Sequence, residues 1–368
     1  MRVLHVFKTY FPDTHGGVEQ VIYQLAEGGA RHGIESHVFS LSPRGAGREE
    51  RYGHHTTHRA RQDVYVASTG FSLSAIRDFR ALVPTMDVVH YHFPWPFMDL
   101  LHLARGTSRP SLVTYHSDIV KQSVLLQAYR PLMRHFLGSM DRIVASSPNY
   151  ATSSPELVRL ADKVRVIPFG LDRATYPPAD PERIAHWRAR LGPRFFLFVG
   201  GLRYYKGLDY LLSAVRGTGI ELAICGGGAA ADSLQGQAEG EGNVHFLGAL
   251  DDADKMALLT LCEAFVLPSH LRSEAFGVSL LEAAMLGKPL VCCEIGTGTT
   301  YINRDGETGL VVPPADVPAL RAALMRLWND PALAARLGAG ARARFDAVFQ
   351  GDAMVDAYAE LYRELAHR

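Results

Sequence analysis

The 368-residue chain lacks the features that mark several special classes of protein. It has only four cysteines, none in C-x-x-C spacing, which argues against a disulfide framework or a zinc site and fits a reducing compartment. No apolar run approaches the roughly 20 residues of a membrane-spanning helix. The apolar start of the chain is too short for the core of a signal peptide. We therefore expect a cytoplasmic protein.

The chain also lacks net charge, with 38 Lys and Arg against 38 Asp and Glu. This balance argues against a general nucleic-acid-binding protein. It hides an asymmetry, because residues 1–173 carry an excess of about five positive charges and the remainder an equal negative excess. The basic part could favour an anionic membrane surface or a phosphorylated acceptor, or it could have no function.

Short apolar runs alternate with segments of helical periodicity, which is typical of α/β proteins with parallel sheets. A proline-rich linker at residues 176–181 interrupts this alternation, which then restarts and so predicts two domains. The expected strands are residues 3–7, 37–41, 87–91, 112–115, 143–146, 164–167, 195–199, 222–225, 244–248, 264–268, 289–293 and 310–314.

Residues 42–62 interrupt the alternation with five arginines and three histidines. We expect a polar loop here, either plainly solvated or facing an acceptor or a membrane. The histidines have no carboxylate or cysteine at ligand spacing, so the segment does not predict a metal site.

Two glutamates, Glu274 and Glu282, lie on either side of Gly277, where the chain is expected to turn from a strand into a helix. The backbone N–H groups of Phe276, Gly277 and Val278 would lie at the open helix N-terminus, which favours a phosphate or diphosphate. Carboxylates accept hydrogen bonds from sugar hydroxyls. Together these groups suggest a nucleotide-sugar site. The alternative is that one glutamate precedes an ordinary helix and the other is solvated on it.

Residues 274–289 resemble the signature of the retaining family-4 glycosyltransferases, close to E-x-F-G-x-x-x-x-E-A-x-x-x-G-x-P. The resemblance implies a GT-B fold, with two Rossmann-like, doubly wound α/β domains facing across a cleft. Residues 1–174, joined by a C-terminal helix at 350–368, would bind the acceptor, and residues 175–349 the donor. Glu274 would contact the donor sugar, Glu282 the ribose, and the backbone after Phe276 the diphosphate.

The loop after residues 195–199 is similar to the family pattern G-R-L-x-x-x-K-G at Lys206 and Gly207, but Gly201 stands where an arginine is usual. Arg203 lies two residues later, on the same face of an extended segment, and is expected to take that role. An arginine and a lysine here would bind a diphosphate by charge-assisted hydrogen bonds.

The resemblance extends to other parts of the chain. A glycine pair follows the first strand, and the string V-T-Y-H-S-D ends in a histidine motif of the family. The catalytic residues we expect are His116, Arg203, Lys206 and Glu274. The donor-binding residues we expect are Gly16, Gly17, Arg203, Lys206, Phe246, Leu247, Glu274, Ala275, Phe276, Gly277, Val278, Leu281 and Glu282. Tyr115 and Asp118 are assigned to the acceptor side. No D-x-D motif occurs in the expected place, so we expect neither a metal nor another cofactor.

Residues 198–208 resemble mannosyl- and rhamnosyltransferases of bacterial O-antigen and capsule assembly. This predicts retaining transfer of mannose or D-rhamnose from a GDP-sugar to a lipid-linked glycan, with peripheral association at the inner membrane through the basic first domain. The alternatives are a UDP-sugar-dependent transferase, a nucleotide-sugar 2-epimerase and a non-catalytic nucleotide-sugar-binding partner.

Overall fold

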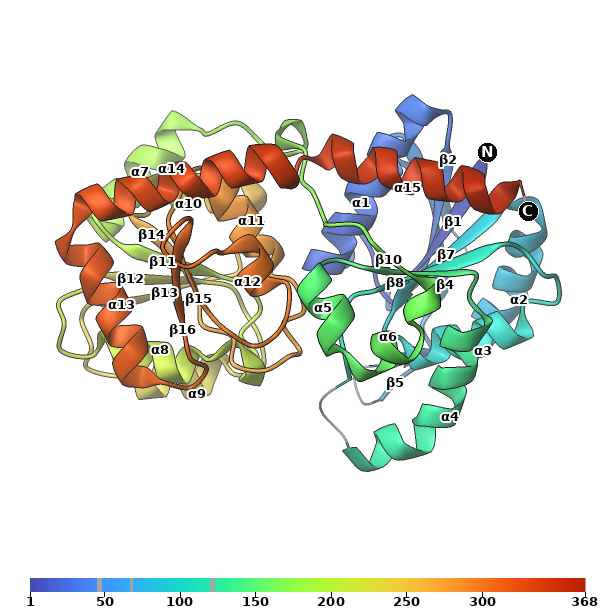
Figure 1. Ribbon diagram of the computed structural model, residues 1–368, viewed down its shortest axis with the longest axis horizontal. Coiled ribbons are helices and arrows are strands. Elements are labelled where there is room, and N and C mark those ends of the chain that lie inside the picture. Colours follow the sequence, from blue (N-terminus) through green and yellow to red (C-terminus); the bar gives the residue numbers. More distant parts are fainter. Residues whose placement is uncertain (45–47, 67–68, 120–122, 368) are drawn as a thin grey trace. The chain divides into compact units, whose positions relative to one another are not determined.

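The computed structural model describes residues 1–44, 48–66, 69–119 and 123–367. The chain divides into two compact units (Figure 1). The first comprises Met1–Gly170 and Gly351–Arg368, and the second Leu171–Gln350. Each unit has its own sheet and its own helices, and each is described separately below.

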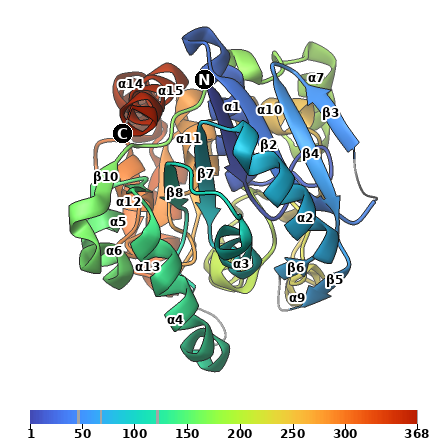
Figure 2. The same cartoon turned by 90° about the vertical axis from the view of Figure 1, so that its right-hand side faces the viewer.

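The sheet of the first unit has eight strands in the order β10-β9-β8-β7-β1-β2-β4-β3. All neighbouring strands are parallel except β3 and β4, which are antiparallel and lie beyond β2 at one edge (Figure 2). The strands are β1 (Arg2–Val6), β2 (Glu35–Ser42), β3 (Arg48–Tyr52), β4 (His55–Arg61), β7 (Val88–Phe93), β8 (Ser111–Tyr115), β9 (Arg142–Ala145) and β10 (Val164–Val166). A small hairpin of β5 (Val64–Val66) and β6 (Thr69–Phe71) is separate from this sheet.

The central strands of this sheet are buried along their whole length because helices cover it. These helices are α1 (Gly17–Gly29), α2 (Leu73–Leu82), α3 (Pro96–Ala104), α4 (Ser123–Ser139), α5 (Pro148–Ser153), α6 (Pro155–Arg159) and α15 (Gly351–Ala366). The last helix of the chain, α15, packs on α1 and on β7. The two ends of the chain therefore contribute to one core.

The sheet of the second unit has six parallel strands in the order β13-β12-β11-β14-β15-β16. They are β11 (Phe196–Val199), β12 (Leu222–Cys225), β13 (Val244–Gly248), β14 (Ala264–Leu267), β15 (Leu290–Cys293) and β16 (Gly309–Val312). The order reverses between β11 and β14, as in a doubly wound dinucleotide-binding sheet. Ligands bind such sheets at the carboxyl ends of the two strands at this switch point.

Eight α-helices of the second unit accompany this sheet in the described residues. They are α7 (Pro181–Leu191), α8 (Leu208–Val215), α9 (Ala231–Gln237), α10 (Asp252–Leu261), α11 (Val278–Met285), α12 (Thr299–Ile302), α13 (Val317–Asn329) and α14 (Pro331–Val348). Helix α11 is covered by α14, and its residues Leu280 to Met285 are buried. This burial fixes the direction in which the N-terminus of α11 points.

The predicted α/β class and the expected strands are confirmed, with boundaries that shift by one or two residues. The predicted polar loop at residues 42–62 is wrong, although residues 45–47 lie outside the described part of the chain. Strand β4 lies there, parallel to β2 and paired with β3. The side chains of His55, Thr57 and Ala60 are buried, so polar residues occupy inward positions and conceal the strand pattern.

Within the described ranges, no helix combines the length and the apolar character needed to cross a membrane.

The turn at Gly207 determines where the loop after β11 meets the loop after β14. Gly207 has a φ of 70°, and a Cβ added there would overlap the carbonyl oxygen of Pro268. Only glycine fits both the left-handed conformation and this close approach. The contact places Lys206 beside the carboxyl end of β14.

We expect Gly207→Ala to destabilise the second unit by roughly 3 kcal/mol or more, because backbone strain adds to a steric overlap. Gly217→Ala is the matched control: its φ is 69°, and nothing lies within 4 Å of the added Cβ. The control should cost about 1 kcal/mol. Denaturant unfolding followed by tryptophan fluorescence measures both, since Trp187 and Trp328 lie in this unit. Equal losses in the two variants would contradict the Pro268 contact.

Candidate functional site

An ion pair between Lys206 and Glu274 joins the two loops at the switch point of the second sheet. Lys206 comes from the loop after β11, and Glu274 from the loop after β14. Ser269 also donates a hydrogen bond to the same carboxylate, at 3.0 Å. The side chains of Lys206 and Glu274 are 12% and 11% exposed, so the pair is shielded but reachable.

The ammonium group of Lys206 stays charged in this environment. Burial alone lowers the pKa of Lys206, but the Glu274 carboxylate outweighs that effect, and the pKa of Lys206 is raised. The pair therefore holds one positive and one negative group where a doubly wound sheet binds its ligand.

The segment after Glu274 forms a tight turn that leads into α11. Gly277 has a φ of 92°, and α11 begins at the next residue. Thr297 donates its hydroxyl to the Glu274 carbonyl at 2.8 Å, and the Gly298 N–H donates to the Ala275 carbonyl at 2.7 Å. These bonds fix the turn, so that the first N–H groups of α11 form a positive helix end suited to an anion.

Glu282 lies within α11 and is held by two groups that sequence reasoning missed. Lys255 of α10 approaches its carboxylate at 2.8 Å, and the Tyr176 hydroxyl donates to it at 3.1 Å. Burial lowers the pKa of Lys255, but the carboxylates of Glu282 and Asp252 raise it by more, so Lys255 is charged. Nothing in the spacing of these residues marks them as partners, and only the fold brings them together.

Arg203 lies beside the position at which the family pattern has an arginine. A Cβ added to Gly201 would lie 3.6 Å from Nε of Arg203. The Arg203 side chain therefore passes next to the space that a side chain at position 201 would enter. This proximity is compatible with the expected substitution of one arginine for the other.

The other expected donor-binding residues differ in what they can offer. Ala275, Phe276 and Leu281 have buried side chains, so a ligand could reach only their backbone. Phe246 and Leu247 lie on the edge strand β13, and their side chains are half-buried.

In the first unit, the glycine pair lies at the start of α1. Gly16 caps the helix, Gly17 is its first residue, and both are exposed. The carboxylate of Glu19 folds back beside Gly16 and accepts hydrogen bonds from the hydroxyls of Thr9 and Thr14, each at 2.8 Å. The helix start is thus partly occupied by a side chain of its own first turn.

His116 follows β8 and is 7% exposed. Its backbone N–H donates to the Phe93 carbonyl at 2.9 Å, and its ring lies against Phe169 with centroids 5.2 Å apart. Burial lowers the pKa of His116 to about 3, so its imidazole is neutral at physiological pH. A neutral imidazole offers one hydrogen-bond donor and one acceptor.

Tyr115 and Asp118 contact each other beside His116. The Tyr115 ring stacks on Phe93, and its hydroxyl donates to the Asp118 carboxylate at 3.0 Å. The same carboxylate accepts a hydrogen bond from Ser154 at 2.7 Å. These bonds shape the loop after β8, while the Tyr115 side chain itself is buried.

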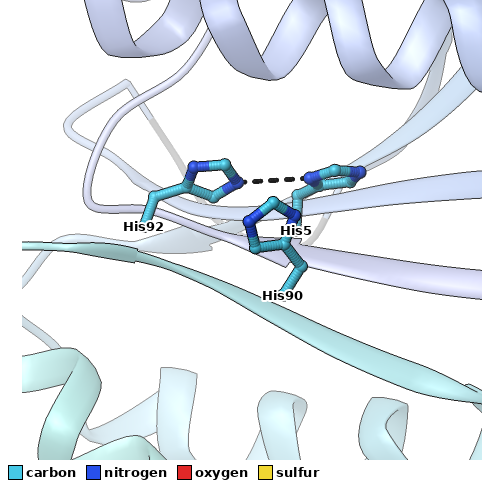
Figure 3. Close-up of side chains that lie close together, drawn as sticks. All are labelled: His5, His90 and His92. Carbon is cyan, nitrogen blue, oxygen red and sulfur yellow. Dashed lines mark hydrogen bonds between the residues drawn. The ribbon is translucent and has the colours of Figure 1, made fainter. Parts of the chain in front are cut away.

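One group of side chains in the described residues has the spacing of a metal site: His5, His90 and His92, with one nitrogen of each within 4.8 Å of the others (Figure 3). Both nitrogens of His90 and both of His92 already have hydrogen-bond partners. A metal would have to displace these bonds. The geometry fits a hydrogen-bonded cluster better than a metal centre.

Comparison with known proteins identifies the family of the chain. Residues 15–175 match the family described as Glycosyltransferase Family 4, and residues 180–344 match Glycosyl transferases group 1. The chain is 56% identical over 351 residues to the D-rhamnosyltransferase WbpZ of Pseudomonas aeruginosa, covering 95% of this chain and 92% of that protein. It is 49% identical over 367 residues to the O-antigen chain mannosyltransferase C of Escherichia coli, covering 99% of each.

Among solved structures, the sucrose-phosphate synthase of Thermosynechococcus elongatus is similar in fold. The TM-score is 0.83 at 22% identity, covering 99% of this chain and 98% of that one. This likeness supports the GT-B fold class.

Seven buried histidines should make the first unit sensitive to acid: His5, His37, His55, His90, His92, His102 and His116. Burial lowers the pKa of His5, His102 and His116 to about 3, lowers those of His90 and His92 well below the usual value, and also lowers those of His37 and His55. The unfolded chain binds these protons near pH 6.5. Their stabilising contribution is therefore complete above pH 6.5 and is lost as the pH falls toward the folded-state values.

We expect each of the five histidines with the lowest pKa, His5, His90, His92, His102 and His116, to lower the free energy of unfolding by about 2 kcal/mol between pH 7.5 and pH 5. Urea unfolding at a series of pH values measures this loss in the first unit when it is followed by fluorescence in a chain with Trp187→Phe and Trp328→Phe, in which Trp95 is the remaining tryptophan. His5→Phe removes one of these proton-binding groups and should reduce the slope by somewhat less than a fifth. A profile that is flat between pH 7.5 and pH 5 would contradict the burial of neutral imidazoles.

Proposed function

Because the chain belongs to the family-4 glycosyltransferases and is a hexosyltransferase, we propose that it transfers mannose or D-rhamnose from a GDP-sugar to a hydroxyl of a lipid-linked glycan in O-antigen assembly. The names of the two bacterial relatives support this choice of sugar and context. We further assign donor binding to residues 175–349. Acceptor binding we assign to residues 1–174 together with the C-terminal helix.

The observation that carries the proposal is the Lys206–Glu274 pair at the switch point, next to the N-terminus of α11. An arriving diphosphate would draw the Lys206 ammonium toward itself and meet the helix end. Glu274 would then accept hydrogen bonds from hydroxyls of the donor sugar. Arg203 supplies a second cation at the same loop.

The reaction we propose retains the anomeric configuration. The bond between the anomeric carbon and the diphosphate oxygen breaks, and the acceptor oxygen bonds to that carbon on the same face. The acceptor proton passes to the leaving diphosphate oxygen. Lys206, Arg203 and the start of α11 would stabilise the negative charge that develops on the diphosphate, which is the main catalytic contribution of such a site.

Glu282 is suited to the ribose of the nucleotide. The residue is 5% exposed and its carboxylate is oriented by Lys255 and Tyr176, so it can accept from ribose hydroxyls without a large change of position. Phe246 and Leu247 would lie near the base. In the first unit, Gly16 and Gly17 would approach the donor phosphate and sugar, and neutral His116 would hydrogen-bond to substrate.

A lipid-linked acceptor requires contact with a membrane surface. The first unit exposes several large apolar side chains, namely Val64, Tyr65, Val66 and Leu73. Exposed arginines such as Arg44 and Arg61 belong to the same unit. We propose peripheral association of this unit with the cytoplasmic face of the inner membrane, because apolar and basic side chains together favour an anionic lipid surface.

Binding of nucleoside diphosphates tests the proposed donor. We expect GDP to raise the melting temperature while UDP, ADP and dTDP do not, since a ligand at 100 times its Kd stabilises by about 2.7 kcal/mol. Lys206→Met should abolish the shift, because it removes the cation that faces the diphosphate. A shift with UDP alone would favour a UDP-sugar transferase or an epimerase and overturn the GDP donor. A shift with GDP but no turnover of GDP-mannose or GDP-rhamnose with acceptor would favour the non-catalytic partner.

Replacing Glu274 tests the sugar contact. We expect Glu274→Gln to lower kcat/KM roughly 10- to 150-fold, because a hydrogen bond to a charged acceptor contributes about 1.5–3 kcal/mol. The control is Glu241→Gln, whose carboxylate pairs with Arg216 at 2.8 Å in the same unit. The control should keep full activity. If Glu274→Gln retains wild-type kcat/KM with an unchanged melting temperature, Glu274 does not contact the reacting sugar.

A further inference from the structure

Three imidazoles form a continuous hydrogen-bonded chain in the first unit, across three neighbouring strands. His5 Nδ1 on β1 lies 3.2 Å from His92 Nε2 on β7 (Figure 3). His92 Nδ1 lies 2.9 Å from Nε2 of His116, which follows β8. The rings of His92 and His116 stack at 28°, with centroids 5.2 Å apart. This series of hydrogen-bonded imidazoles therefore leads from His5, inside the sheet, to His116, which is expected to contact substrate.

All three rings are neutral, so each has one N–H and one bare nitrogen. Burial keeps the pKa of His5 and of His116 at about 3, and that of His92 well below its usual value. Two arrangements of the protons are then possible, with every N–H pointing along the chain toward His116 or every N–H pointing away from it.

The environment of His5, at the end of the hydrogen-bonded series opposite His116, decides between these arrangements. Nε2 of His5 is buried and has no hydrogen-bond partner among the described residues. If the protons pointed away from His116, this nitrogen would carry an orphaned N–H, which is rare in buried positions. If they point toward His116, it is only an unused acceptor. The arrangement with the N–H groups pointing toward His116 is therefore favoured: His5 donates to His92, and His92 donates to Nε2 of His116.

We propose that His5 and His92 are positioning residues that hold His116 as its Nδ1–H tautomer, so that His116 presents a fixed, uncharged hydrogen-bond donor to an oxygen atom of the bound substrate. This inference rests on the proposed function, in which His116 contacts substrate. In the described residues, no group bonds to Nδ1 of His116, which leaves that N–H available. The tautomer of a histidine is set by the bond that its other nitrogen makes.

His90 provides a matched control within the same cluster. It lies on the same strand and face as His92, and their ring centroids are 4.2 Å apart. Its nitrogens bond to the hydroxyls of Thr114 and Tyr362, each at 2.7 Å, and not to His116. Replacing His90 therefore removes an equally buried imidazole with two hydrogen bonds, but leaves the chain to His116 intact.

The tautomer can be measured directly by NMR of the full chain labelled with ¹⁵N in its imidazole rings, with His116→Gln used to assign the signal. We expect the His116 proton on Nδ1 in the wild type and in His90→Leu, and its transfer to Nε2 or an averaged signal in His92→Leu. An Nε2–H tautomer in the wild type would overturn the inference. This readout does not depend on turnover, so it stands even if the proposed donor or the role of His116 is wrong.

Kinetics test whether the tautomer matters to the reaction. With whichever donor proves active, we expect His92→Leu to lower kcat roughly 10- to 100-fold with a smaller change in KM, as for other residues that orient a functional side chain. His92→Asn, which keeps a donor near the position of Nδ1, should restore part of the loss. His90→Leu should stay within a few-fold of the wild type.

Two outcomes would count against the inference. Unchanged kcat in His92→Leu, together with an altered tautomer, would show that the tautomer has no bearing on transfer. Equal losses in His90→Leu and His92→Leu, with one zinc ion bound per wild-type chain and none in either variant, would instead identify a metal centre formed by His5, His90 and His92.

Discussion

The site in the second unit depends on a shielded ion pair at a topological switch point. The loops that follow the adjacent parallel strands β11 and β14 bring Lys206 and Glu274 together, and Gly207 allows these loops to approach each other. A shielded ion pair is weak evidence for stability, because desolvation offsets most of its attraction. Placed beside the N-terminus of α11, it keeps a cation and a hydrogen-bond acceptor ready for a diphosphate and for the sugar attached to it.

The carboxylate of Glu282 is also held by a charged partner, whereas His116 of the first unit is held by a neutral one. Glu282 has Lys255 and Tyr176 as partners, so each of the two carboxylates is oriented by a lysine before any ligand binds. In the first unit, the corresponding groups are neutral imidazoles, whose charged forms burial disfavours. The two glutamates are thus held by charged lysines, whereas the ring of His116 hydrogen-bonds to a neutral ring.

The sequence was most informative where a segment has a simple apolar pattern or a recognisable motif. Buried parallel strands such as β1 and β14 are continuous or nearly continuous apolar runs, so they could be predicted, and the E-x-F-G motif pointed to the loop before α11. Strand β4 could not, because His55 and Thr57 occupy inward positions and polar side chains hide the alternation. Lys255 lies 27 residues from Glu282 in another helix, and no local pattern joins them.

The histidine chain shows why imidazoles, and not a carboxylate, would orient His116. A carboxylate bonded to His116 would favour its protonated form, as the aspartate does in a Ser-His-Asp triad. An imidazolium would place a positive charge beside the substrate atom that His116 contacts in the proposed function. A neutral imidazole at position 92 can donate to His116 without adding charge, and it accepts from His5 in turn. The direction of the hydrogen bonds is then transmitted through neutral imidazoles, so that orienting His116 adds no charge to it.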